Sequence, residues 1–139
     1  MLPRCAPFAA HLPSLGCAAN GSDCVLSVRV HDSSGSMVSD NFNLFLPPKS
    51  LTALPDARIN LTIGEATAHG RFPITLRSSR TALYVTMTTL AAGRFQRNAF
   101  LLHADTPAVV EFLPWAGFEE AVLRRSLRVE SLASYMPTT

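Results

Sequence analysis

The strongest constraint on the fold is a series of short segments in which apolar and polar residues alternate. Residues 25–31 (VLSVRVH) and 58–63 (RINLTI) have this alternation, and residues 81–89 (TALYVTMTT) are rich in β-branched and aromatic residues. Alternation places successive side chains on opposite faces of a strand, which suits a half-buried sheet. We therefore predict strands over residues 25–31, 37–46, 58–63, 71–78, 81–89, 98–103 and 108–114, with a closing strand within 126–132.

Turn signals separate these segments. Clusters of small polar residues, glycine and proline occupy residues 32–36, 64–70 and 104–107, and Gly93 ends the strand that begins at residue 81. The chain order then predicts two hairpins, one of residues 25–31 with 37–46 and one of residues 98–103 with 108–114. In the tail, we expect a helical turn or more in the first half of residues 118–136.

Roughly seven or eight short strands, without a long helical period, indicate an all-β protein. We predict an immunoglobulin-like antiparallel β-sandwich, with a barrel as the alternative. The residues on the apolar faces of the predicted strands form the expected core: Phe42, Leu44, Ile74, Val85, Leu101 and Phe112.

Composition excludes several classes of protein. The chain has 139 residues, which suits one domain, and its 47% hydrophobic content argues against disorder. The net charge is only +2, and the basic residues are scattered, so we expect no nucleic-acid partner. No apolar run after the N-terminal segment approaches the length of a membrane span.

The cysteines all lie near the N-terminus, at Cys5, Cys17 and Cys24. Together with His11 they raise the question of zinc, but they include no Cys-x-x-Cys pair, so we predict no metal site. Ordinary thiols and one disulfide both remain open.

The N-terminal residues 1–19 have the outline of a signal peptide, although Pro7 and Pro13 interrupt its apolar part. Two glycosylation sequons follow, at Asn20 and Asn60, and they give weak support for a secretory route.

No arrangement of residues points to catalysis. Glu119 and Glu120 are adjacent, so a strand would place them on opposite faces, and Glu111 and Glu130 are expected to face solvent. The histidines fall at strand ends or in turns: His11, His31, His69 and His103. We predict no catalytic residue and no cofactor, while Trp115 fits either a cap on the core or an exposed contact.

Residues 93–115 (GRFQRNAFLLHADTPAVVEFLPW) carry a recognisable pattern. It resembles the last domain of the lysosomal-type β-mannosidases of glycoside hydrolase family 2, in which Gly-Arg-Phe-x-x-Asn-x-Phe-Leu leads to an aromatic residue and Pro-Trp. The matching positions here are Gly93, Arg94, Phe95, Asn98, Phe100, Leu101, Phe112, Pro114 and Trp115. Residues 37–59 and 127–136 resemble further parts of that domain.

The resemblance implies an immunoglobulin-like sandwich over residues 25–136, preceded by an irregular segment at residues 1–24. It also implies that the parent enzyme removes terminal β-linked mannose with a separate (β/α)8 barrel, which needs at least about 200 residues. No catalytic residue carries over to this chain. The expected partners are the barrel and other domains of the parent, with contacts at Trp115 and Phe118, and the expected location is the lysosome or secretory pathway. The alternative is a free-standing sandwich that binds carbohydrate or protein.

Overall fold

The structure is a computed structural model, and it describes residues 8–51, 54, 56–104 and 106–136. The chain divides into two compact units, Met1–Leu54 and Pro55–Thr139. None of the helices in the described ranges combines the length and apolarity needed to cross a membrane.

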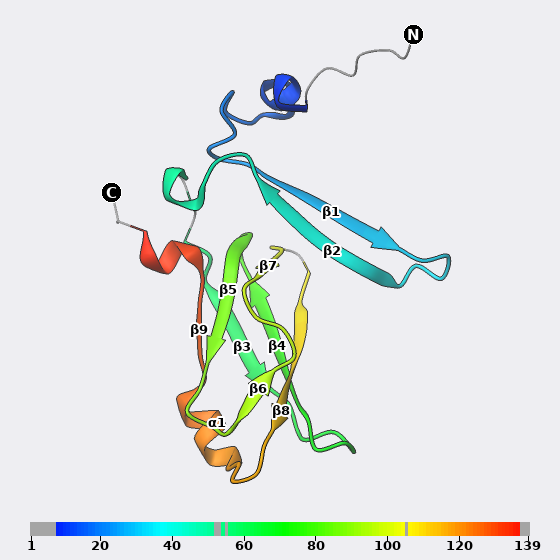
Figure 1. Ribbon diagram of the computed structural model, residues 1–139, viewed down its shortest axis with the longest axis vertical. Helices are drawn as coiled ribbons and strands as arrows, with labels where there is room; N and C mark the ends of the chain where they lie inside the picture. The colour runs from blue at the N-terminus through cyan, green and yellow to red at the C-terminus, as the bar shows by residue number, and fades with distance from the viewer. Residues whose placement is uncertain (1–7, 52–53, 55, 105, 137–139) are drawn as a thin grey trace. The chain divides into compact units, whose positions relative to one another are not determined.

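The second unit contains two antiparallel sheets (Figure 1). The four-stranded sheet has the order β3 (Ile59–Ile63), β4 (Phe72–Ser78), β8 (Ala108–Pro114) and β6 (Gly93–Phe95). The three-stranded sheet has the order β7 (Phe100–Leu102), β5 (Ala82–Thr88) and β9 (Arg128–Glu130). The predicted all-β, immunoglobulin-like sandwich is confirmed.

One apolar cluster joins the two sheets. In β4 the side chains alternate between buried and less buried, so that Phe72, Ile74 and Leu76 lie on one face. The other central members of the cluster come from β5, β7, β8 and α1: Val85, Met87, Leu102, Val110, Phe112 and Leu123. Period-two alternation therefore located this core correctly.

The predicted core is confirmed at Ile74, Val85, Leu101 and Phe112, all of which are buried. Phe42 and Leu44 are only half-buried. Both lie in the first unit, on a two-stranded sheet, and such a sheet has fewer neighbours to cover a side chain than a sandwich has.

The predicted hairpin of residues 98–103 with 108–114 is wrong. The two strands exist as β7 and β8, but β7 pairs with β5, whereas β8 pairs with β4 and β6. The consecutive strands β7 and β8 therefore belong to different sheets. Strand β5 ends at Thr88, and Gly93 begins the short strand β6.

The first unit contains a 3-10 helix at Phe8–Leu15, strands β1 (Val25–His31) and β2 (Met37–Leu44), and a short 3-10 helix at Pro48–Ser50. Strands β1 and β2 form the predicted hairpin, and among the described residues they pair only with each other. In the second unit the first strand along the chain is β3, and the predicted domain start at residue 25 stays a prediction. Alternation identifies a strand but not the sheet that it joins.

The tail of the second unit follows the prediction. Helix α1 (Glu120–Ser126) is followed by β9 and by a 3-10 helix at Leu132–Tyr135. Arg124 of α1 donates to a carboxylate oxygen of Glu120 at 2.7 Å and to the carbonyl oxygen of Ile63 at 3.1 Å. These contacts hold the helix against the end of β3.

Candidate functional site

The segment that carries the resemblance, residues 93–115, has a structural role at almost every matched position. Gly93 is required by a close approach, because a Cβ atom there would lie 2.3 Å from Cζ of Phe112 and 2.6 Å from the carbonyl oxygen of Leu113. Any side chain would push β6 away from β8, to which Gly93 pairs opposite Pro114.

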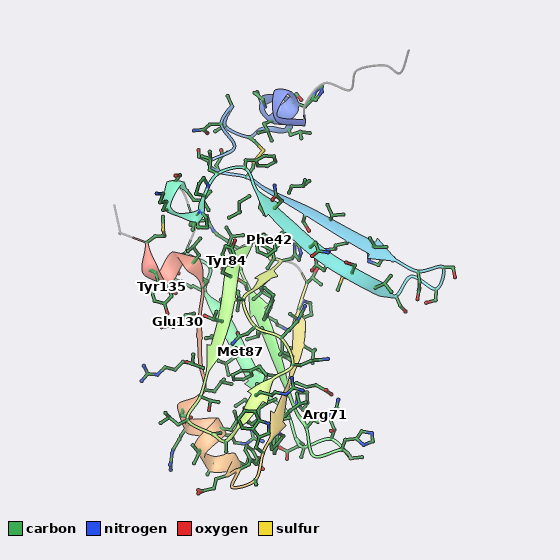
Figure 2. The ribbon with its side chains drawn as sticks, viewed as in Figure 1. Phe42, Arg71, Tyr84, Met87, Glu130 and Tyr135 are labelled. Carbon is green, nitrogen blue, oxygen red and sulfur yellow. A yellow bond between two sulfur atoms is a disulfide. The ribbon has the colours of Figure 1, made fainter. Side chains whose placement is uncertain are left out.

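Asn98, two residues before β7 begins, extends the pairing of β5 beyond Phe100. Its side-chain oxygen accepts from the Met87 amide at 2.7 Å, and its side-chain nitrogen donates to the Met87 carbonyl at 2.9 Å. Val85 pairs with Phe100, so the same antiparallel register, continued by two positions, places Asn98 opposite Met87. Its amide group therefore substitutes for a backbone strand partner. Met87 is labelled in Figure 2.

The aromatic residues of this segment pack in the core. The ring centroid of Phe112 lies 5.3 Å from that of Phe95 and 5.6 Å from that of Phe118, and Phe118 lies 5.1 Å from Phe72. These are the separations at which aromatic pairs attract each other. Phe118 is half-buried within this cluster.

Trp115 is the exception. Its side chain is 60% exposed, although its backbone amide donates to the carbonyl oxygen of Ala92 at 3.1 Å. The Trp115 carbonyl then accepts from the amide of Phe118, across a turn in which Gly117 has a φ of 81°. The backbone is thus fixed while the indole faces outward. The sequence left two alternatives for Trp115, a cap on the core or an exposed side chain, and the structure has the exposed side chain. The use of Trp115 in an interdomain contact stays a prediction.

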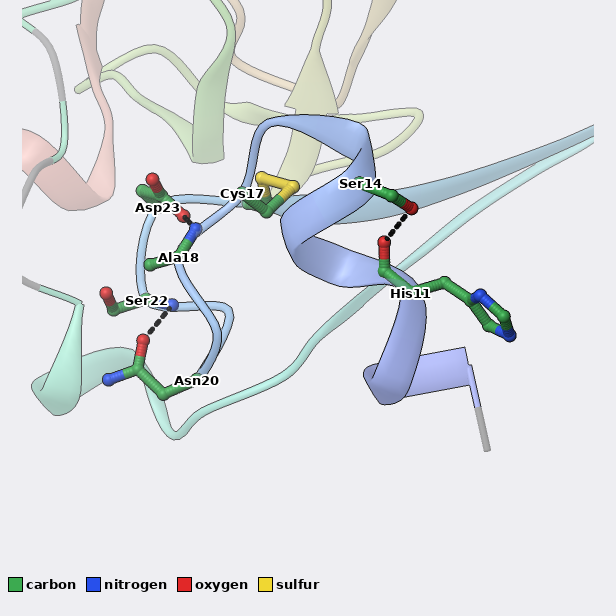
Figure 3. The surroundings of a disulfide bond; sticks show 8 residues. His11, Ser14, Cys17, Ala18, Asn20, Ser22 and Asp23 are labelled. Carbon is green, nitrogen blue, oxygen red and sulfur yellow. Dashed lines mark hydrogen bonds between the residues drawn. A yellow bond between two sulfur atoms is a disulfide. The ribbon is translucent and has the colours of Figure 1, made fainter. Parts of the chain in front are cut away.

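Both sequon asparagines are exposed. Asn20 lies in the loop after the first 3-10 helix, where its side-chain oxygen accepts from the Ser22 amide at 3.1 Å (Figure 3). Asn60 lies on the edge strand β3, opposite Arg77 of β4. Each asparagine is accessible to a glycan, and their glycosylation remains a prediction.

A disulfide joins Cys17 to Cys24 (Figure 3). Both sulfur atoms lie within 4.8 Å of a carboxylate oxygen of Asp23, which makes these three residues resemble a metal cluster. Because the two sulfurs are bonded to each other, they are not thiolate ligands. Of the two forms left open by the sequence, the structure contains the disulfide, whereas Cys5 lies outside the described residues.

Three of the glutamates considered for catalysis have local partners. Glu111 forms an ion pair with Arg71 at 2.8 Å, Glu120 pairs with Arg124, and the Tyr135 hydroxyl donates to Glu130 (Figure 2). Glu119 precedes α1 and is exposed. Such partners fit a structural role at turns and chain ends. Glu111 and Glu130 were expected to face solvent, but both are half-buried.

Two pKa shifts follow from these local contacts. The hydrogen bond from the Ser34 hydroxyl, together with those from backbone amides of the turn, lowers the pKa of Asp32. The hydrogen bond to Glu130 raises the pKa of Tyr135, because that bond requires the protonated phenol. Both groups are exposed, and both shifts belong to turns or chain ends.

The histidines differ in their exposure. His11, His31 and His69 are exposed, and His103 is half-buried. His31 ends β1 and His69 lies in the β3–β4 turn, as the sequence predicted.

These observations define a class of protein, namely an immunoglobulin-like sandwich in which the distinctive residues build the scaffold. A family model described as the Ig-fold domain of mannosidases matches residues 54–135. The chain belongs to this family, and its matched part is a non-catalytic accessory domain. The match begins at the boundary between the two units of the structure. No curated protein matches the chain.

Proposed function

We propose that this chain is the C-terminal accessory domain, or a fragment containing it, of a β-mannosidase. The parent enzyme would hydrolyse terminal non-reducing β-D-mannose residues of glycoprotein-derived oligosaccharides. The observation that carries the proposal is the family match over residues 54–135. The structural roles of Gly93, Asn98 and Phe112 in the Gly-Arg-Phe to Pro-Trp segment support it.

In this proposal the domain acts by docking. Trp115 is held by backbone hydrogen bonds with its indole exposed, which suits a contact with the barrel or with another domain of the parent. Phe118 supports that contact from within the core, because its ring packs against Phe72 and Phe112. Exposed tryptophan is a frequent anchor of protein interfaces.

A lysosomal or secretory location is part of the same proposal. The Cys17–Cys24 disulfide supports it, since disulfides persist in oxidising compartments. The exposed sequons at Asn20 and Asn60 agree with it.

A free-standing carbohydrate-binding or protein-binding module is the second candidate, and exposed Trp115 is the observation in its favour. A sugar-binding platform needs aromatic rings that are free to stack on the ligand. The ring of Phe118, the aromatic residue next to Trp115 along the chain, is already engaged in the core. We therefore favour docking within a parent enzyme.

The experiment assays two proteins for hydrolysis of an aryl β-D-mannoside, namely the purified chain and the product of the extended reading frame. The purified chain is expected to give no turnover. The product of the same reading frame, extended upstream of Met1, is expected to include a barrel and to hydrolyse the substrate. An upstream region without a barrel would contradict the proposal. So would turnover by the short chain that disappears on Glu119→Gln or Glu120→Gln.

A further inference from the structure

A hollow of about 520 Å³ opens on the second unit where the end of β5 meets the junction of α1 and β9. Its lining residues come from the end of β5 and the loop after it, from α1 and from β9: Thr88, Thr89, Leu90, Arg125, Ser126 and Arg128. None of them belongs to the Gly-Arg-Phe to Pro-Trp segment.

The wall of the hollow is held by a network centred on Ser126. The Ser126 hydroxyl donates to the Val122 carbonyl at 2.6 Å, lies 2.9 Å from Oγ1 of Thr89, and accepts from the Leu90 amide at 3.0 Å. One side chain thus ties the loop after β5 to the last turn of α1. The hollow is therefore preformed, which lowers the entropy cost of binding.

Within the described part of the chain, the positive charges of Arg125 and Arg128 have no ion-pair partner. The neighbouring Arg124 is engaged, with Glu120 at 2.7 Å and Glu65 at 3.5 Å. No described carboxylate comes within the ion-pair distance of 4.0 Å of Arg125 or Arg128. Arg125 and Arg128 thus both line the hollow, and neither forms an ion pair with a carboxylate of the described residues.

The apolar part of the hollow is Leu90, which is 86% exposed and lies in the loop that Ser126 fixes. An ordered, solvent-facing leucine beside two arginines and the hydroxyl of Thr88 presents apolar and cationic surface together. Guanidinium groups bind carboxylates through paired hydrogen bonds, and leucine favours an apolar neighbour on the same ligand.

We propose that this hollow binds an acidic segment of a partner protein. An Asp or Glu carboxylate of that segment lies between Arg125 and Arg128, and an apolar residue next to it packs on Leu90. The proposal does not depend on the activity of any parent enzyme, because it follows from charge complementarity at the hollow alone.

The test uses the whole chain, labelled with ¹⁵N, and a soluble six-residue peptide of alternating glutamate and leucine. A matched peptide with glutamine in place of glutamate is the ligand control. We expect saturable shifts of the Thr89, Leu90 and Ser126 amides with the glutamate peptide and none with the glutamine peptide. Arg125→Gln and Arg128→Gln should each weaken binding about tenfold, the scale of one lost charge-assisted hydrogen bond.

Arg77→Gln is the matched protein control, since Arg77 is an exposed arginine on β4 and its loss changes the net charge equally. Arg125→Lys and Arg128→Lys keep the charge but lose the planar guanidinium group, so they should weaken binding less than the glutamine variants. They also test the site if the glutamine variants fail to fold. Equal binding of both peptides, an equal loss with Arg77→Gln, or equal affinity for inorganic phosphate would overturn the proposal.

Discussion

Individual residues of the Gly-Arg-Phe to Pro-Trp segment solve local problems of packing and hydrogen bonding. Gly93 admits the Phe112 ring, and Asn98 completes a strand ladder with its side chain. Phe112 is fully buried and contacts aromatic rings on two sides. The segment is distinctive because each of these contacts tolerates few other residues.

Phe112→Ala tests this view of the core. We expect a loss of about 3–5 kcal/mol in the free energy of unfolding, because truncation leaves a cavity among Phe72, Phe95 and Phe118. Denaturant titration measures the loss. Val109→Ala on the same strand is the control, since Val109 is 55% exposed and should change stability little. A loss below about 1 kcal/mol for Phe112→Ala would contradict the packing described.

Tyr135 provides a test by pH. Its hydrogen bond to Glu130 raises its pKa above the ordinary value of 10.0, so spectroscopic titration should find its midpoint above that value. The stabilisation from this bond is complete below pH 10 and is lost as the pH rises through the folded-state pKa.

The chain has two tyrosines, so the Tyr135 signal is the difference between the wild type and Tyr135→Phe. Glu130→Ala should lower the midpoint, whereas Glu119→Ala should leave it unchanged. An identical midpoint in wild type and Glu130→Ala would show that the bond does not form in solution.

At the scale of elements, β5 is the strand on which the three-stranded sheet depends. It lies between β7 and β9, and its register with β7 shifts between Ala82 and Val85, where Tyr84 has a φ of 51°. Such a shift is typical of a β-bulge. On the β7 side the ladder is short, so the Asn98 side chain extends it to Met87.

Asn98→Ala should therefore destabilise the domain by about 2 kcal/mol, because it leaves the amide and carbonyl of Met87 without their partner. The stability of Asn98→Asp should lie between those of the wild type and Asn98→Ala. Aspartate accepts a hydrogen bond from the Met87 amide but does not donate one to the Met87 carbonyl. Gln96→Ala, at an exposed position nearby, is the control. Thermal or denaturant unfolding measures these changes, and equal stability of wild type and Asn98→Ala would refute the ladder argument.

At the scale of the whole molecule, the chain contains one complete sandwich and one smaller unit. The family match and the structural division both place the boundary near Leu54. The second unit carries the exposed Trp115 and Leu90, and the chain as a whole is only 16% charged. Exposed apolar side chains on an accessory domain suit contacts with neighbouring domains.

Without such neighbours we expect the isolated chain to self-associate at micromolar concentrations. Trp115→Ser should reduce self-association without unfolding the domain, because the indole is 60% exposed. Sedimentation velocity measures the first effect and circular dichroism the second. Val109→Ser, at another exposed apolar position, is the control. A clean monomer at high concentration, or unfolding of Trp115→Ser, would contradict the docking role.

The sequence by itself determined the class of fold, the places of the strands and the family. Alternating segments such as 25–31 and 71–78 form strands, because the side-chain period of a strand depends only on neighbouring residues. The expected helical turn in the tail is the helix at Glu120–Ser126. The same period located Ile74, Val85 and Phe112 in the core.

Only the tertiary structure decided how the strands of the second unit pair and what the exposed residues can reach. Residues 98–103 and 108–114 look like a hairpin along the chain, yet β7 and β8 join different sheets. The role of Asn98, the orientation of Trp115 and the hollow at Arg125 and Arg128 depend on residues distant in sequence. Strand partners and side-chain clusters are set by long-range packing, which a local pattern does not encode.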